Sequence, residues 1–198
     1  MPAETERECK QWLRKQSERL IEEIRQQRKL LAAEKGEFKP EIGSVFVREL
    51  MQDVHYLYVN HEVARSRTLV LGDVPDQAIF TDAAILRRIL GNLVKNALEA
   101  ILAGETVTMF CESSEDKITF CVHNPGVMPT EVQLQVFQRS FSSKGTDGRG
   151  IGTYSVKLFG ERYLKGAVSF VSREPEGTTF RFTLFNANSA ELIKLYEQ

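Results

Sequence analysis

Apolar residues in the first 35 positions recur at heptad spacing and form a narrow stripe on an otherwise polar segment. The a and d positions of this heptad hold Leu13, Ser17, Leu20, Ile24, Gln27 and Leu31. The pattern predicts one long helix over residues 4–35, which Gly36 and Pro40 would end. A narrow stripe suits another helix better than a wide core. Two interpretations stay open: a surface helix of its own domain, or half of a helical hairpin whose other half lies outside this chain.

After residue 40 the apolar spacing alternates between that of helices and that of strands. The expected helices span 44–60, 81–102, 130–137, 153–164 and 189–196. The expected strands span 67–71, 78–80, 106–112, 117–122, 167–172 and 178–185. Helices mixed with strands, and consecutive strands late in the chain, predict an α+β fold in the form of a two-layer α/β sandwich.

Composition and charge narrow the classes of function. The formal net charge of the 198 residues is -1, so no global field attracts nucleic acid or an anionic membrane, and we expect no nucleic-acid partner. No apolar run reaches the roughly 18 residues that a membrane-spanning helix needs. The N-terminus lacks an apolar signal-peptide region, and the three cysteines fit neither a disulfide framework nor a zinc site. A cytoplasmic location is the simplest expectation.

Two asparagines stand four residues apart in the helix expected over 81–102. At about 100° per residue, the polar arc of that helix holds Arg88, Asn92, Lys95, Asn96 and Glu99. Asparagine is a mediocre helix former and costs stability unless its amide is used. An amide oxygen is a hard, neutral ligand that can complete the octahedral shell of Mg²⁺ beside phosphate oxygens. On this helix alone, a magnesium–phosphate site and an ordinary solvated face fit equally well.

A first glycine-containing loop, HNPGVMP at 123–129, directly follows an expected strand. Pro125 and Gly126 force a sharp turn that brings Asn124 to the sheet edge, where an adenine could lie. The side-chain carbonyl of Asn124 could accept a hydrogen bond from the adenine amino group. A plain turn is the simpler interpretation of this loop on its own.

A second loop, GTDGRGIGTYSVK at 145–157, alternates Gly148, Gly150 and Gly152 just before a helix. Glycines let backbone N–H groups approach phosphate oxygens, and a helix N-terminus adds partial positive charge. The preceding FQRSFSSKG carries Phe141 as an apolar anchor and Lys144 as a cation that can meet a terminal phosphate. We expect this stretch to form a lid over a bound nucleotide.

Taken together, these segments resemble the motifs of the GHKL superfamily, which includes DNA gyrase, the large heat-shock chaperone ATPase, the MutL repair protein and histidine kinases. NLVKNALEA is similar to its N box, HNPGVMP to its first glycine box, VFQRSFSSKG to its F box and GRGIG to its second glycine box. They occur in the family's order and at its usual spacing, within residues 44–186. The resemblance implies the Bergerat ATP-binding fold, in which helices cover one face of a mixed sheet.

The resemblance also implies ATP and Mg²⁺ as cofactors and assigns roles to individual residues. Asn96 matches the magnesium-coordinating asparagine, and Asn92 and Lys95 lie beside it near the phosphates. Asn124 falls where the family usually has an adenine-reading aspartate, although the box is one residue short and His123 is an alternative match. Asn keeps the acceptor but loses the charge, so we expect weaker adenine affinity. Gly126 belongs to the first glycine box; Phe141 and Lys144 match the lid, and Gly148, Arg149, Gly150, Ile151 and Gly152 match the triphosphate loop.

Asn92 occupies the position where ATPase branches of the superfamily carry a glutamate general base. An amide cannot take a proton from water, so the resemblance favours a kinase over a hydrolase. Asn92, Asn96 and Lys144 are the residues expected to support phosphoryl transfer by a sensor histidine kinase. Transfer of this kind depends on positioning and charge neutralisation.

The acceptor histidine is expected outside this chain. His55 and His61 lie too close to the N box and lack the usual proline context, so we interpret both as structural. Residues 1–38 resemble the second helix of a dimerisation hairpin with its linker, and 39–198 resemble the catalytic domain. The expected partners are the phosphoacceptor domain of a parent kinase and a response regulator. The heptad makes a homodimer plausible, and whether the parent is membrane-anchored stays open.

Two other functions remain open at this point. One is a degenerate nucleotide-binding module with a regulatory role, which the altered first glycine box favours. The other is a serine kinase of the anti-sigma type, which resembles the same fold. The long N-terminal heptad helix favours the histidine-kinase branch over both.

Overall fold

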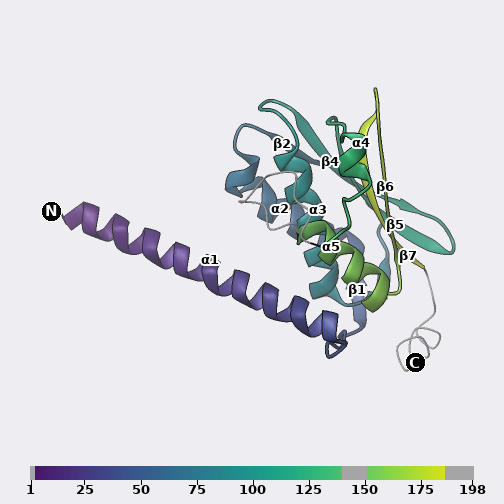
Figure 1. The fold of residues 1–198 in the computed structure, drawn as a ribbon, viewed down its shortest axis with the longest axis horizontal. Coiled ribbons are helices and arrows are strands. Elements are labelled where there is room, and N and C mark those ends of the chain that lie inside the picture. The colour runs from purple at the N-terminus through teal and green to yellow at the C-terminus, as the bar shows by residue number, and fades with distance from the viewer. Residues whose placement is uncertain (1–2, 140–150, 186–198) are drawn as a thin grey trace. The chain divides into compact units, whose positions relative to one another are not determined.

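The computed structural model describes residues 3–139 and 151–185 (Figure 1). The chain divides into two compact units, residues 1–39 and 40–198, and each is described by itself. The predicted helix 189–196 lies outside the described residues.

The first unit is dominated by one long helix, α1 (Ala3–Lys35). Its bounds agree with the helix predicted from the heptad. Leu13, Leu20, Ile24 and Leu31 are each at least half exposed. Among the described residues, no helix is both long and apolar enough to cross a membrane.

The second unit contains two sheets. β1 (Gly43–Phe46) and β3 (Ala78–Thr81) form an antiparallel pair. The main sheet has the strand order β2-β4-β5-β7-β6. β2 pairs parallel with β4, whereas every other neighbouring pair is antiparallel, so this sheet is mixed as expected. Its strands are β2 (Thr68–Leu71), β4 (Thr106–Ser113), β5 (Lys117–Asn124), β6 (Ala167–Arg173) and β7 (Gly177–Phe185).

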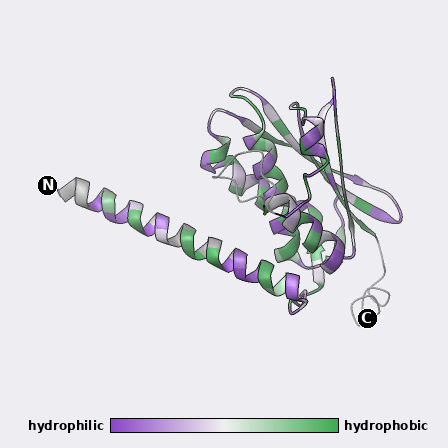
Figure 2. Ribbon diagram, in the orientation of Figure 1, coloured by the Kyte–Doolittle hydropathy of each residue, from purple (hydrophilic) through white to green (hydrophobic). Residues whose placement is uncertain are grey.

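The helices of the second unit lie on one side of this sheet (Figure 1). They are α2 (Val47–Val59), the short η1 (Glu62–Ala64), α3 (Ala83–Glu99), α4 (Thr130–Gln133), α5 (Gly152–Lys157) and the π-helix η3 (Leu158–Tyr163). Hydrophobic residues are frequent in α3 and in the strands of the main sheet (Figure 2). The buried ones on α3 and on the helix-facing strand positions form the core. The fully buried members include Leu86, Ile89, Leu90, Leu93, Met109, Phe120, Val122 and Phe182. Layering of helices on one sheet face confirms the α+β two-layer sandwich.

The structure corrects the sequence prediction at several element boundaries. The helix expected from residue 44 begins at Val47, because residues 43–46 form β1 instead. Val45 and Phe46 pair with Ile79 and Ala78 of β3, and this long-range pairing overrides the local helical spacing.

Two other helices differ in their ends or type. The helix expected over 130–137 is the single turn α4, and the helix expected over 153–164 is α5 followed by the π-helix η3. The central helix α3 ends at Glu99, three residues earlier than expected.

Candidate functional site

The central helix α3 has a firmly fixed beginning at Asp82. One carboxylate oxygen, Oδ1, accepts hydrogen bonds from the backbone N–H groups of Ala84 and Ile85, each at 2.9 Å. The other, Oδ2, accepts from the Glu41 N–H at 2.8 Å. Capping of this kind satisfies N–H groups that have no partner inside the helix. The cap therefore fixes where α3 starts. The apolar face of α3 packs on the core, and this packing fixes which residues of the helix point away from it.

The two asparagines of the polar arc lie near the beginning of α5. A Cβ added to Gly152 would lie 3.5 Å from Asn96 Nδ2 and 3.6 Å from Asn96 Oδ1. Asn96 and Gly152, far apart in sequence, are thus neighbours in space. Lys95 is half exposed, and its Nζ lies 3.9 Å from Glu99 Oε1 on the same helix.

Asn92 lies one turn before Asn96 and is linked to α5 through Ser155. Asn92 Nδ2 donates to Ser155 Oγ at 3.0 Å, and Ser155 Oγ donates to the Gly152 carbonyl at 2.8 Å. Ser155 is buried, whereas Asn92 is half-buried. Sequence reasoning missed Ser155, although a polar residue beside Val156 and Phe159 on the buried side of the helix was a signal that could have found it.

The other end of α3 lies against the first glycine-containing loop. Asn124 is the last residue of β5, is only 2% exposed, and shares a strand face with Phe120 and Val122 of the core. Its Oδ1 accepts from the Gly126 N–H at 2.9 Å, and a Cβ on Gly126 would lie 3.2 Å from the carbonyl oxygen of Ala100. Asn124 therefore faces the helix layer, near the C-terminal end of α3.

His123, the alternative match for the adenine-reading position, points to the opposite face of the sheet. Side chains alternate between faces along a strand, so neighbours at 123 and 124 cannot share one. His123 Nδ1 and Thr179 Oγ1 lie 3.0 Å apart, and these residues are paired across β5 and β7.

A hydroxyl pair holds the loop after Asn124 in place. Thr178 Oγ1 donates to the Gly126 carbonyl at 2.7 Å, and Ser172 Oγ accepts from the Met128 N–H at 2.8 Å. The two hydroxyl oxygens are themselves 2.7 Å apart. Beside them Gly177 has a positive φ of 79°, and a Cβ there would collide with the Asn124 carbonyl. Sequence reasoning missed Thr178, which is 2% exposed, because threonine is ordinary in a strand.

The segment before the glycine loop is anchored by Phe137. Its ring packs edge-on against Phe170 and Phe180, with centroids 5.8 and 6.3 Å apart. The Nζ of Lys157 lies 5.5 Å from the centroid of the same ring. Thr153 Oγ1 donates to the Val136 carbonyl, which ties the start of α5 to this segment. Of the residues predicted for the lid and the triphosphate loop, Ile151 and Gly152 are described; Phe141, Lys144, Gly148, Arg149 and Gly150 lie outside the described residues.

Residues 81–188 match the family model of the histidine kinase-, DNA gyrase B- and HSP90-like ATPases. The chain belongs to this family. Among solved structures, the catalytic domain of the histidine kinase ThkA is similar with a TM-score of 0.66 and 25% identity, over 74% of this chain and 96% of that one. The chain is thus a GHKL domain of the histidine-kinase type.

Curated relatives place the domain among the sensor kinases. A probable C4-dicarboxylate sensor kinase of Halalkalibacterium halodurans is 35% identical over 101 residues, which cover 48% of this chain and 19% of that protein. The sensor histidine kinase CusS of Escherichia coli is 33% identical over 130 residues, covering 62% of this chain and 26% of that protein. Across the first relatives, the matched region is 19–44% of the other protein's length. The chain therefore corresponds to the catalytic domain of larger kinases.

The residues present in this GHKL domain suit a magnesium–triphosphate. Within residues 3–139 and 151–185, no cluster of three or more His, Cys, Asp or Glu side chains could hold a metal ion. Mg²⁺ commonly takes only one or two protein ligands and completes its shell with phosphate oxygens and water. The Asn96 carboxamide beside Gly152, a residue without a side chain, is a donor set of that kind.

Burial controls the ionisation of three groups in the domain. It raises the pKa of Tyr58 to about 12, with a smaller contribution from Glu99. Burial likewise raises the pKa of Cys111 and of Cys121 to about 12. These thiols stay protonated at neutral pH, so neither is a nucleophile.

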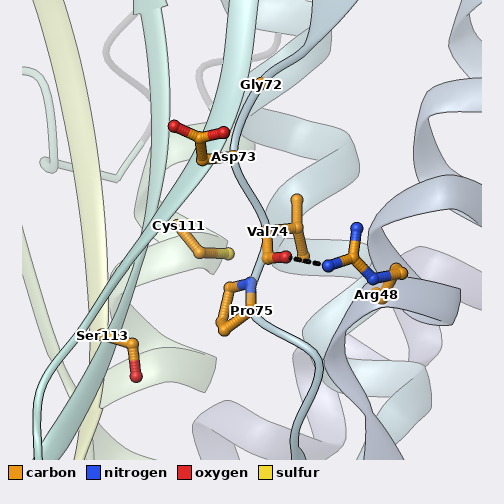
Figure 3. A pocket seen from close by; sticks show the side chains of 7 residues that line it. All are labelled: Arg48, Gly72, Asp73, Val74, Pro75, Cys111 and Ser113. Atoms are coloured by element: carbon orange, nitrogen blue, oxygen red, sulfur yellow. Dashed lines mark hydrogen bonds between the residues drawn. The ribbon is translucent and has the colours of Figure 1, made fainter.

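A shallow hollow of about 350 Å³ lies at the other end of the sheet (Figure 3). It is lined by Arg48, Gly72, Asp73, Val74, Pro75, Cys111 and Ser113. Ser113 pairs with Ile118 near the start of β5, whereas Asn124 is at its end. Arg48 donates to the Val74 carbonyl at 2.5 Å, and Ser113 Oγ lies 3.3 Å from Gln77 Oε1, so these two polar side chains of the lining already have protein partners.

Proposed function

We propose that the domain binds Mg-ATP along α3, with the adenine near Asn124 and the triphosphate near Asn96 and the start of α5. The proximity of Asn96 to Gly152 carries the proposal, because it joins two motifs that sequence resemblance assigned to the same phosphate site. Bound Mg²⁺ would neutralise phosphate charge, and the Asn96 amide oxygen would hold it.

The geometry of the first glycine loop supports Asn124 over His123 as the adenine-reading residue. Asn124 faces the helix layer that carries Asn92 and Asn96, whereas His123 faces the opposite side and is paired with Thr179. The Asn124 Oδ1 already accepts from Gly126, so it has one remaining lone pair for the adenine amino group.

We further propose that the domain donates the γ-phosphoryl group to a histidine of a sensor kinase. The imidazole nitrogen would form a bond to the γ-phosphorus as the bond to the bridging oxygen breaks, and ADP would leave with that electron pair. Asn92 supports transfer over hydrolysis, since its amide, held by Ser155, cannot act as a base toward water. Lys144 is proposed to meet the terminal phosphate.

The partners of such a kinase extend beyond this chain. We propose a phosphoacceptor domain on the same parent protein, a response regulator downstream and a cytoplasmic location. The exposed apolar heptad positions of α1 support a homodimer through that helix.

Calorimetric titration with ATP, in Mg²⁺ and in EDTA, tests the binding proposal. ATP is expected to bind more tightly in Mg²⁺ than in EDTA. In Asn96→Ala the ratio of these two affinities is expected to fall at least about tenfold, because one metal ligand is removed. Asn60→Ala is the matched control, because Asn60 is exposed and its side chain bonds only to Tyr56 of its own helix. Equal Mg²⁺ dependence in the wild type and Asn96→Ala would refute the proposal.

A nucleotide-binding regulatory module is the second candidate, and the neutral Asn124 in place of an acid favours it. One experiment distinguishes the kinase from the regulatory module. The domain is incubated with radiolabelled ATP and a separately supplied dimerisation domain that carries the acceptor histidine. Acid-labile, alkali-stable label on the acceptor supports the kinase; tight binding without transfer supports the module.

A further inference from the structure

We propose that Ser155 is a positioning residue that decides which end of the Asn92 amide faces the nucleotide. The inference rests on the proposed Mg-ATP site. It concerns a residue outside the four sequence motifs, and it follows from the single proton of a serine hydroxyl.

The Ser155 hydroxyl has two neighbours and one proton. Its Oγ lies 2.8 Å from the Gly152 carbonyl oxygen, which can only accept a hydrogen bond. The proton is therefore committed to Gly152, and Oγ can act only as an acceptor toward Asn92, 3.0 Å away. The group within reach of Oγ on Asn92 must then be the amide nitrogen.

Burial makes this arrangement costly to change. Ser155 is 2% exposed, so a hydroxyl or amide that lost its partner there would find little water to replace it. The Ser155 N–H also makes an early hydrogen bond of α5, to the Ile151 carbonyl at 2.8 Å, which fixes the position of its side chain.

The consequence is a fixed polarity at position 92. With Nδ2 held by Ser155, the Asn92 Oδ1 is the end of the amide left for a ligand. An amide oxygen is an acceptor, so this end of Asn92 would receive a hydrogen bond from metal-bound water or approach the cation. The same hydroxyl bonds the carbonyl of Gly152, whose Cα side faces Asn96, so Ser155 contacts both Asn92 and the residue beside Asn96.

A double-mutant cycle on the whole 198-residue chain tests this role. ATP affinity is measured in Mg²⁺ and in EDTA for four proteins: the wild type, Ser155→Ala, Asn92→Ala and the double variant. The magnesium gain of each protein is its affinity in Mg²⁺ divided by its affinity in EDTA. Because the half-buried Asn92 amide loses the partner that orients it, Ser155→Ala is expected to lower the gain roughly five- to thirtyfold, with affinity in EDTA within about twofold of wild type. The magnesium gain of the double variant is expected to be within about twofold of that of Asn92→Ala, because Ser155 acts through the amide that Asn92→Ala has already removed.

Each outcome has a defined meaning. A full magnesium gain in Ser155→Ala, or additive losses in the double variant, would overturn the positioning role while leaving the Mg-ATP site intact. No magnesium gain in the wild type would remove the proposed function itself, and the inference with it. Ser169→Ala, in an exposed position of β6, is the control and is expected to match the wild type. Thermal unfolding of each variant shows that the affinities belong to folded protein.

Discussion

At the scale of single residues, the site is defined by neutral amides and hydroxyls. Asn92, Asn96 and Asn124 are all positioned by the fold, and two of them have one end of the amide already bonded within the protein. Neutral groups can be half-buried without the desolvation cost of a charge. The described part of the candidate site therefore presents preformed neutral acceptors, and in the proposed function charge neutralisation falls to Mg²⁺.

Asn124→Ala is predicted to lower ATP affinity about tenfold, because a buried acceptor for the adenine amino group is removed. His123→Ala is the matched comparison on the same strand, and we expect it to change affinity less than about twofold, since His123 faces the other side of the sheet. Fluorescent-nucleotide displacement measures both. A larger loss in His123→Ala would reverse the assignment.

The raised pKa values predict a loss of stability in alkali. Burial raises the pKa of Cys111 and Cys121 from 9.0 to about 12, so folded thiols keep protons that unfolded thiols lose. Both states are protonated below about pH 9, and there the thiols give no pH dependence. As pH rises from about 9 toward 12 the unfolded chain binds fewer protons, so the free energy of unfolding falls.

Urea unfolding at about pH 8 and about pH 10.5 measures this fall. Other groups also titrate in that range, so the comparison is between the wild type and a variant with Cys111→Ala and Cys121→Ala. We expect the variant to be less stable than the wild type at the lower pH. Between the lower and the higher pH, its free energy of unfolding is expected to fall by less than that of the wild type. Parallel losses in the two proteins would contradict the assignment.

At the scale of elements, α3 and its cap organise the whole site. The buried face of α3 fixes the rotation of the helix, and Asp82 fixes its first residue. As a result Asn92 and Asn96 face α5, and the C-terminal end of α3 lies against the 124–129 loop. The sequence predicted this helix and its polar arc, because long amphipathic helices have a strong periodic signal. It also predicted all five strands of the main sheet, to within two residues at each end.

What the sequence did not predict depends on contacts between distant segments. β1 was read as helix because Val45 and Phe46 have helical spacing with Leu50, and only the pairing with β3 decides otherwise. Ser155 and Thr178 went unnoticed because one serine or threonine has no periodic signature, and their roles arise from partners 63 and 52 residues away. The role of Asn96 stays a prediction, which rests on the motif of known order that surrounds it.

Asp82→Ala is predicted to destabilise the domain by about 1–3 kcal/mol, because three backbone N–H groups lose their acceptor. Asp53→Ala is the matched control: its carboxylate makes an exposed ion pair with Arg87 at 3.0 Å and is expected to contribute about 0–1 kcal/mol. Chemical denaturation followed by circular dichroism measures the difference. Equal stabilities for the two variants would show that the cap is unimportant.

At the scale of the whole molecule, the chain joins a long heptad helix to a GHKL domain of the histidine-kinase type. The matched region is less than half of the length of each of the first curated relatives. The second unit contains the described residues of the proposed nucleotide site within one two-layer sandwich. Nucleotide binding is therefore expected to be a property of residues 40–198.

Nuclear magnetic resonance with Mn²⁺ in place of Mg²⁺ tests the central claim most directly, since Mn²⁺ broadens signals of nuclei close to it. With ATP present, Mn²⁺ is predicted to remove the side-chain amide signal of Asn96 and the backbone signal of Gly152. The side-chain amide of Gln77, beside Ser113 at the opposite end of the sheet, is expected to stay sharp. With Mg²⁺ and ATP all three signals should persist. An Asn96 signal that stays as sharp as that of Gln77 in saturating Mn-ATP would contradict the account.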